Sequence, residues 1–345
     1  MMTFPANAVG AAAGPFPATL IDDLAAEISE HGFEVAREGA GLAVTLGIGR
    51  VEAVPDGGRF EVRIGSQQTS QVQEIREAFL HLLDHAAPGL ADRMAWQGDL
   101  PQGTRPPNFR TASVVSVETV TPNFLRMTLA ADNVADFAGD QMHFRLAIPP
   151  RDRKPVWPHL DVAGRTIWPK GEDALHRPAY TFVEVDPKSG CFSFDLYIHQ
   201  GGVATEWART ARPGDVVGMM GPGGGTPPPG DFLLMAGDET ALPAIRRILE
   251  VSPAERRGHV FIELGDGEDR CEIAAPDGVR VEWLVRGDGQ DVWERIAAVP
   301  FPGVGASRFV WIAAERELAR KARAHFRNVH AVTLDETYIS AYWTK

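Results

Sequence analysis

The sequence of 345 residues predicts a multidomain protein: a small N-terminal α+β domain, an antiparallel β-barrel and a C-terminal α/β domain with a parallel sheet. Three observations predict this architecture. Two helical patterns enclose short strands, six strand patterns with turn residues follow, and strands then alternate with helices. We place the domains at 18–99, 109–228 and 229–345. An Ala/Gly/Pro-rich start predicts a flexible tail over 1–17, and dense Pro and Gly predict a linker over 100–108.

In the small domain, apolar residues at helical spacing predict helices over 19–31 and 69–85. Alternating residues between them predict strands over 42–46, near Val51 and over 60–64.

The small domain also carries three histidines, His31, His81 and His85. The last two are four positions apart and would share one helix face, but no third ligand is evident. We therefore expect no metal site there, and none elsewhere in the chain.

The middle of the chain changes to strand patterns, with Asp186-Pro187-Lys188-Ser189-Gly190 as a strong turn. Strands are expected over 111–120, 124–129, 142–148, 180–185, 192–198 and 216–220. Six such strands suit a closed or nearly closed antiparallel barrel. The segment 149–177 is too long for a hairpin and lacks a period, which is typical of functional or mobile loops.

The last domain alternates strands and helices, which predicts a parallel sheet covered by helices. Strands are expected over 232–236, 260–264, 281–285 and 309–313, with helices over 240–249, 290–298 and 315–324. Ligands of such sheets bind at the carboxyl ends of the strands. Gly237 follows the first strand and would let a ligand approach the backbone, while Thr240 can cap the next helix.

Bulk properties exclude several classes of protein. The formal net charge of −12 and the pI of about 5.3 argue against general nucleic-acid binding and against attraction to anionic lipid. No run approaches the roughly 18 apolar residues of a spanning helix, and the start lacks the basic residues of a secretory signal. Cys191 and Cys271 form no metal spacing or disulfide framework, so we expect a cytoplasmic protein. We also expect a monomer.

Several residues in the middle domain suit the parts of a flavin dinucleotide. Tyr180 offers a flat ring for stacking, and Thr181 a hydroxyl for the flavin edge. Arg177 offers a fixed positive fork for phosphate. Gly201-Gly202 precede a predicted helix over 204–211, whose first N–H groups would favour a pyrophosphate.

These motifs resemble the FAD-binding barrel of siderophore-interacting proteins, the flavin-dependent ferric-siderophore reductases. The resemblance rests on the strings Arg177-Pro178-Ala179-Tyr180-Thr181, Gly201-Gly202-Val203-Ala204-Thr205-Glu206-Trp207, Gly221-Pro222-Gly223-Gly224-Gly225, Asp238-Glu239-Thr240-Ala241-Leu242-Pro243-Ala244 and Ala341-Tyr342-Trp343. It extends from about Asn108 to the end of the chain. The N-terminal part resembles a small domain of unknown function that is sometimes fused to such proteins.

The resemblance implies FAD in the barrel and NAD(P)H in the second domain. Hydride would pass from NAD(P)H to the flavin, and single electrons from the flavin to an Fe(III)-siderophore, with no catalytic side chain. The cofactor-binding residues it implies are Arg177, Tyr180, Thr181, His199, Gly202, Val203, Ala204, Thr205, Trp207, Gly237, Asp238, Glu239, Thr240 and Trp343.

The likeness favours NADPH over NADH as the electron donor. Unsorted candidates for binding its extra phosphate are Arg246, Arg286, Arg316 and Lys321.

Five positions depart from the family pattern. Arg177 stands three residues before the tyrosine instead of two, Val183, Glu206 and Thr344 replace basic residues, and Arg145 replaces a lysine. FAD binding is still expected, but the case for a strongly anionic siderophore is weaker.

A basic segment could still gather an anionic chelate. Between Arg145 and Arg177, seven Lys or Arg stand against four Asp or Glu, which leaves this segment at +3. Strand alternation points Arg145 outward, and we expect Arg145, Arg151 and Lys154 to attract the substrate. A solvated loop without such a role explains the charges equally well.

Three functions therefore remain open. The first is an NAD(P)H-dependent ferric-siderophore reductase. The second is a flavin-binding siderophore-interacting protein without reductase activity. The third is a general NAD(P)H flavin reductase, or diaphorase, with freely exchanging flavin.

Overall fold

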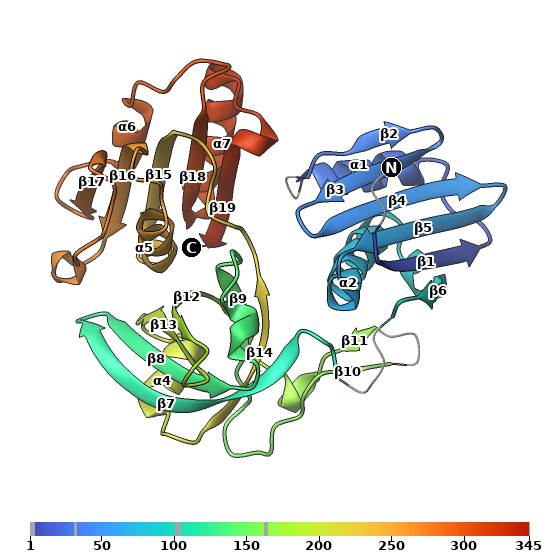
Figure 1. The fold of residues 1–345 in the computed structure, drawn as a ribbon, viewed down its shortest axis with the longest axis horizontal. Coiled ribbons are helices and arrows are strands. Elements are labelled where there is room, and N and C mark those ends of the chain that lie inside the picture. The colour runs from blue at the N-terminus through green and yellow to red at the C-terminus, as the bar shows by residue number, and fades with distance from the viewer. Residues whose placement is uncertain (1–3, 31–32, 101–104, 162–164, 345) are drawn as a thin grey trace. The chain divides into compact units, whose positions relative to one another are not determined.

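The computed structural model describes residues 4–30, 33–100, 105–161 and 165–344. These residues divide into two compact units, whose elements are labelled in Figure 1. Unit 1 comprises Met1–Phe109 and Lys154–Ala174, and unit 2 comprises Arg110–Arg153 and Leu175–Lys345. None of the helices in the described part of the chain has both the length and the apolar character needed to cross a lipid bilayer.

Unit 1 is an antiparallel six-stranded sheet with helices packed against it, as the α+β prediction requires. The strand order is β2-β3-β4-β5-β1-β6. The elements are β1 (Ala6–Ala13), α1 (Leu20–Glu30), β2 (Ala36–Glu38), β3 (Gly41–Leu46), β4 (Gly49–Asp56), β5 (Arg59–Ser66), α2 (Thr69–Ala86), α3 (Leu90–Arg93) and β6 (Ala95–Gly98). Buried side chains such as Leu24, Phe60 and Leu83 join the helices to the sheet. The predicted end of the first helix, at His31, lies outside the described residues.

The predicted flexible tail over 1–17 is wrong for most of its length, because β1 lies inside the sheet. Ala6, Ala8 and Ala12 are buried, and β1 pairs with β5 on one side and β6 on the other. A side chain at Gly10 would meet the Trp96 ring at 2.6 Å, so that position must be small. The small residues that suggested flexibility therefore permit close packing. Of the predicted linker over 100–108, residues 101–104 lie outside the described residues.

Most of the long segment between the barrel strands β9 (His143–Ala147) and β12 (Ala179–Asp186) belongs to unit 1, namely Lys154–Ala174. It forms a short hairpin of β10 (His159–Leu160) and β11 (Thr166–Ile167). The Thr166 N–H donates to the carboxylate of Glu77 on α2, and Arg165 pairs with Asp92 of α3. Nearby on α2, the His81 and His85 rings contact each other with centroids 4.4 Å apart.

Unit 2 contains the predicted barrel, which is closed and antiparallel in the order β12-β13-β8-β7-β14-β9. Its elements are β7 (Phe109–Thr121), β8 (Phe124–Ala131), β9 (His143–Ala147), β12 (Ala179–Asp186), β13 (Cys191–Tyr197), α4 (Val203–Thr210) and β14 (Val216–Gly223). Stacked and edge-on phenylalanines fill it, with Phe144, Phe182 and Phe192 in mutual contact. Each is at most 2% exposed, so apolar burial holds these strands together.

The second part of unit 2 is the predicted parallel sheet, in the order β17-β16-β15-β18-β19. Its elements are β15 (Phe232–Asp238), α5 (Leu242–Glu250), β16 (Arg257–Leu264), β17 (Gly278–Val285), α6 (Val292–Ala297), β18 (Arg308–Glu315), α7 (Arg316–His330) and β19 (Thr337–Trp343). Two separate cores cover the two faces of the sheet, one under α5 and the other under α6 and α7. The edge strand β19 was not predicted.

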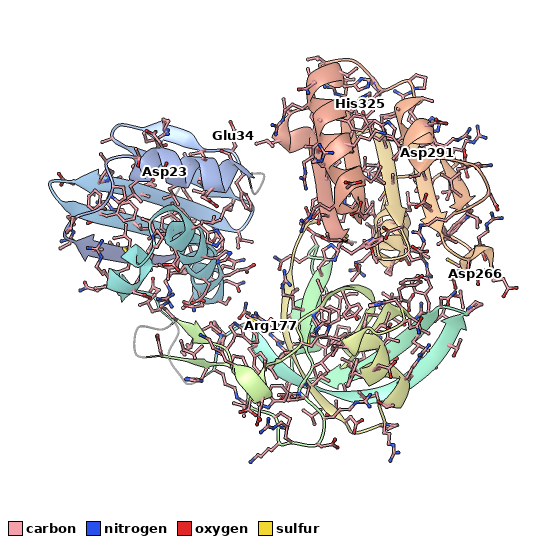
Figure 2. The ribbon with its side chains drawn as sticks, turned by 180° about the vertical axis from the view of Figure 1, so that it is seen from behind. Asp23, Glu34, Arg177, Asp266, Asp291 and His325 are labelled. Atoms are coloured by element: carbon pink, nitrogen blue, oxygen red, sulfur yellow. The ribbon has the colours of Figure 1, made fainter. Side chains whose placement is uncertain are left out.

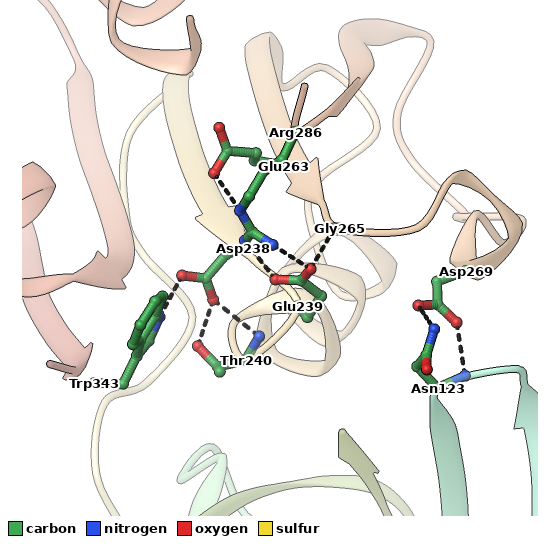
Figure 3. A network of polar contacts seen from close by, with 9 residues as sticks. All are labelled: Asn123, Asp238, Glu239, Thr240, Glu263, Gly265, Asp269, Arg286 and Trp343. Atoms are coloured by element: carbon green, nitrogen blue, oxygen red, sulfur yellow. Dashed lines mark hydrogen bonds and ion pairs between the residues drawn. The ribbon is translucent and has the colours of Figure 1, made fainter. Parts of the chain in front are cut away.

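Two buried carboxylates join the barrel to the parallel sheet. Asp269, which is 1% exposed, accepts hydrogen bonds from the Asn123 backbone and side-chain N–H groups, each at 2.9 Å (Figure 3). It also accepts a bond from the Thr121 hydroxyl at 2.7 Å. Asp195 on β13 accepts two bonds from Arg126 and a further bond from Arg246 on α5, at 3.2 Å. These bonds set the position of the sheet against the barrel.

Packing alone is enough to require glycine at position 237, whatever ligand the sheet binds. A Cβ there would lie 2.5 Å from the Cβ of Ala241 and 2.9 Å from the carbonyl oxygen of Ala313. We expect Gly237→Val to destabilise the protein by about 1–3 kcal/mol, since α5 or β18 must shift. Urea unfolding measures this. Gly303→Val is the control, because a Cβ there would meet none of the described atoms within 4 Å. Equal stability of the two variants would contradict this view.

Candidate cofactor site

The pairing of β9 with β12 assembles the core of the candidate site. Thr181 lies opposite His143, Tyr180 opposite Phe144, and Ala179 opposite Arg145. The Tyr180 ring contacts Phe194 and Phe144, with centroids 4.7 and 6.3 Å apart. Burial raises the pKa of the Tyr180 phenol, so this side chain stays neutral. The ring of Tyr180, the residue predicted to stack on the flavin, thus packs against the aromatic core of the barrel.

His143 was not predicted as a site residue, yet its ring holds Thr181. The Thr181 hydroxyl and His143 Nδ1 share a hydrogen bond of 3.1 Å, and Thr181 is 6% exposed. Burial lowers the pKa of His143 to about 4, and nearby Arg247 acts in the same direction. A neutral imidazole therefore sits behind the predicted flavin-edge residue. The signal that could have found it is strand register, which the sequence of β9 alone does not show.

The glycine-rich run that ends β14 closes over this imidazole. A Cβ at Gly224 would lie 2.6 Å from the His143 ring, and φ there is +80°. Gly221 has a φ of +149° and lies against Phe144, where a Cβ would come within 2.9 Å. Both positions therefore need glycine for close packing and for a backbone conformation that other residues rarely adopt.

The start of α4 fits the predicted anion site. Gly202 is the N-cap and has no side chain to cover the first N–H groups of the helix, which have no partners inside the helix itself. A Cβ on Gly202 would lie 2.4 Å from the His199 ring, so glycine is required. The Thr205 hydroxyl is 1% exposed and accepts the His199 N–H at 3.2 Å.

The remaining residues predicted on α4 differ in their surroundings. Val203 is 55% exposed, Ala204 is buried in the barrel core, and Trp207 packs partly against that core.

Two arginines gather at the entrance to β12. Arg177 precedes the strand (Figure 2), and its carbonyl accepts a hydrogen bond of 3.5 Å from exposed Arg145. Burial, and then the nearby charge of Arg145, lowers the pKa of Arg177. Two arginines this close make the start of β12 locally basic.

The other two predicted substrate residues do not join this pair. Arg151 donates to the carbonyl of Glu206 and the hydroxyl of Thr210 on α4. Lys154 begins the segment that belongs to unit 1.

The predicted nicotinamide residues form a network at the carboxyl edge of the parallel sheet (Figure 3). Buried Asp238 accepts hydrogen bonds from the Thr240 N–H and hydroxyl, at 2.9 and 2.5 Å, and from the Trp343 indole at 2.7 Å. Buried Glu239 accepts from the Gly265 N–H and from Arg286. Burial raises the pKa of Asp238, and the hydrogen bonds from Thr240 and Trp343 act in the opposite direction. The structure makes Thr240 and Trp343 two hydrogen-bond partners of Asp238.

Comparison with known proteins agrees with this geometry. Residues 113–226 match a family model described as the siderophore-interacting FAD-binding domain, and residues 231–345 one described as siderophore-interacting protein. The chain is 31% identical over 247 residues to the ferric vibriobactin reductase ViuB of Vibrio cholerae, which covers 68% of this chain and 89% of that protein.

Two further proteins are similar. The NADPH-dependent ferric-chelate reductase of Escherichia coli K12 is 30% identical over 245 residues, covering 68% of this chain and 92% of that protein. A solved structure, a siderophore utilization protein from T. fusca, has a TM-score of 0.61 and 27% identity, covering 69% of this chain and 93% of that one.

The low pKa of His143 predicts a loss of stability in acid. The native state keeps the ring neutral down to about pH 4, whereas the unfolded chain takes up a proton below its ordinary value of 6.5. Stability should therefore be full above that value and fall by up to about 3 kcal/mol on going to pH 4. Urea unfolding across this range measures it. His143→Asn, which cannot titrate, should lose less, and identical pH profiles for the two proteins would contradict the assignment.

Proposed function

The chain belongs to the family of siderophore-interacting proteins, and on that premise we propose that it is a flavoprotein that reduces Fe(III)-siderophores with electrons from NAD(P)H. The single observation that best supports this is that Tyr180, Thr181 and a helix start without a side-chain cap all belong to the part of the chain that matches an FAD-binding domain.

The described residues fit FAD in three respects. Tyr180 offers a ring fixed by the barrel core, and Thr181 a hydroxyl held by His143. The helix start at Gly202 offers N–H groups and a partial positive charge for a pyrophosphate. When bound, FAD supplies the redox chemistry that links a two-electron nicotinamide donor to one-electron reduction of iron. The surrounding residues bind it, orient it and keep one side of the ring site dry.

Arg145 and Arg177 are proposed to receive the ferric chelate. Both lie at the start of the strand that carries Tyr180, where local positive charge would attract an anionic chelate. Reduction of the iron would weaken its hold on hard oxygen ligands and so release it. Arg151 is left out of this proposal because it bonds to α4, and Lys154 stays a prediction. A cytoplasmic location stays a prediction.

A second candidate function is a siderophore-interacting flavoprotein that is not reduced by nicotinamide. The carboxylate of Asp238 already accepts the Thr240 N–H at the start of α5, where a dinucleotide in a parallel sheet would place its pyrophosphate. The visible spectrum of the purified protein during anaerobic titration with NADH and NADPH separates the two candidates. Bleaching of the flavin bands supports the reductase. A flavin that is bleached by dithionite but by neither nucleotide would support the second candidate.

We expect Gly202→Val to weaken FAD binding by at least about tenfold, because the new side chain would meet His199 and cover the helix start. Flavin fluorescence during titration of the apoprotein measures the dissociation constant. Gly139→Val is the matched control, since a Cβ there would meet none of the described atoms within 4 Å. A colourless wild-type protein that takes up no FAD would overturn the proposal of a flavoprotein.

Arg145→Ala should raise the Michaelis constant for an anionic ferric siderophore several-fold and at most about tenfold, since an exposed charge contact contributes about 1 kcal/mol. The effect should shrink with added salt, while flavin reduction by the nicotinamide stays unchanged. Lys188→Ala, in the exposed turn after β12, serves as the control. If both variants behave as wild type with anionic, neutral and cationic chelates, Arg145 is only a solvated charge.

A further inference from the structure

The carboxyl ends of three neighbouring strands meet in one ion triad, the set Glu239, Glu263 and Arg286 (Figure 3). Arg286 follows β17 and donates from both terminal nitrogens to Glu239, each at 2.6 Å. Its Nε donates to Glu263 on β16 at 2.9 Å. Glu239 also accepts the N–H of Gly265, just after β16, at 2.5 Å.

The triad carries more negative than positive charge. Two carboxylates share one guanidinium, and hydrogen bonding to Glu239 is the main reason that the pKa of Arg286 is raised. The Glu239 side chain is 4% exposed, that of Glu263 is 23% exposed and that of Arg286 is 37% exposed. A nucleotide arriving from solvent would therefore meet the Glu263–Arg286 pair and not Glu239.

The other cations considered for an extra phosphate are placed elsewhere. Arg246 bonds to Asp195 of the barrel, and Lys321 lies 4.7 Å from the centre of the Trp293 ring. Arg316 begins α7 after β18, on the opposite side of β15 from the triad in the strand order. Among these candidates, Arg286 alone belongs to the β16–β17 edge, and two carboxylates already neutralise it.

The position of Glu263 is one that distinguishes NADH from NADPH in dinucleotide-binding parallel sheets. An acidic residue at the end of the second strand accepts a hydrogen bond from the ribose 2′-hydroxyl of NADH, whereas a nearby arginine accommodates the 2′-phosphate of NADPH. Here β16 is the second strand, and Glu263 lies near its carboxyl end. To bind Arg286, a 2′-phosphate would have to break the bond between Arg286 and Glu263. It would then lie beside the Glu263 carboxylate, and the two negative charges would repel each other.

We propose that this protein selects NADH over NADPH and that Glu263 is the residue that sets the selectivity. The proposal rests on the proposed function, in which a nicotinamide dinucleotide binds the carboxyl edge of this sheet. It reverses the preference for NADPH that family likeness suggested.

The test compares NAD⁺ and NADP⁺, which differ by the 2′-phosphate alone, in calorimetric titrations of the full-length flavoprotein. We expect NAD⁺ to bind at least about tenfold more tightly. In Glu263→Gln the ratio should fall by about fivefold or more, mainly through tighter NADP⁺ binding. Glu282→Gln on β17 is the matched control, because it removes the same charge from another Glu–Arg pair, that with Arg295. Anaerobic flavin reduction by NADH and NADPH should show the same order.

Three other outcomes would contradict the proposed selection of NADH, and they can be told apart. Equal or tighter binding of NADP⁺ by the wild-type protein would refute NADH selection while leaving the reductase in place. Glu263→Gln and Glu282→Gln with the same ratio would refute the role of Glu263. If the flavin is reduced by dithionite but by neither nucleotide, the proposed reductase fails, and the selectivity fails with it. The wild-type comparison holds even if a variant does not fold.

Discussion

The site depends on one constraint, the register of β9 against β12. That register sets His143 beside Thr181 and Arg145 beside Ala179, and it presses the Tyr180 ring onto the phenylalanine core. A slip of one residue would turn every side chain of β9 to the other face of the barrel. The aromatic core opposes such a slip, because Phe144 and Leu146 would leave it. The glycines at 221 and 224 then allow β14 to close over the same residues.

Polar bonds, and not apolar packing alone, set the carboxyl edge of the parallel sheet. Asp238 ties Trp343 of the last strand to the turn after β15, and Glu239 ties that turn to the ends of β16 and β17. Burying carboxylates is unfavourable unless each is bonded, and here each is. The same residues thus hold the edge in shape and determine its charge, on which the proposed choice of nucleotide rests.

The segment of unit 1 over 154–174 lies, in chain order, between β9 and β12 of the barrel. The chain leaves the barrel after β9, forms the β10–β11 hairpin that packs with α2 and α3, and returns just before Arg177. The ends of this excursion are therefore the two strands that carry Arg145 and Tyr180.

The sequence by itself determined the three-part architecture and the family. The alternation of strands in the barrel, the strand–helix order after residue 229 and the motif from Arg177 to Gly225 are local patterns, and the closed barrel, the parallel sheet and the family matches confirm them. The individual roles of the fourteen cofactor residues stay predictions. The tertiary structure alone decided which groups are partners, because hydrogen bonds and ion pairs join residues far apart in the chain. It placed His143 beside Thr181, paired Arg286 with two carboxylates, and showed that close packing requires glycine at position 237. It also placed the Ala-rich start in a sheet, since pairing with β5 and β6 supplies the order that a run of small residues lacks alone.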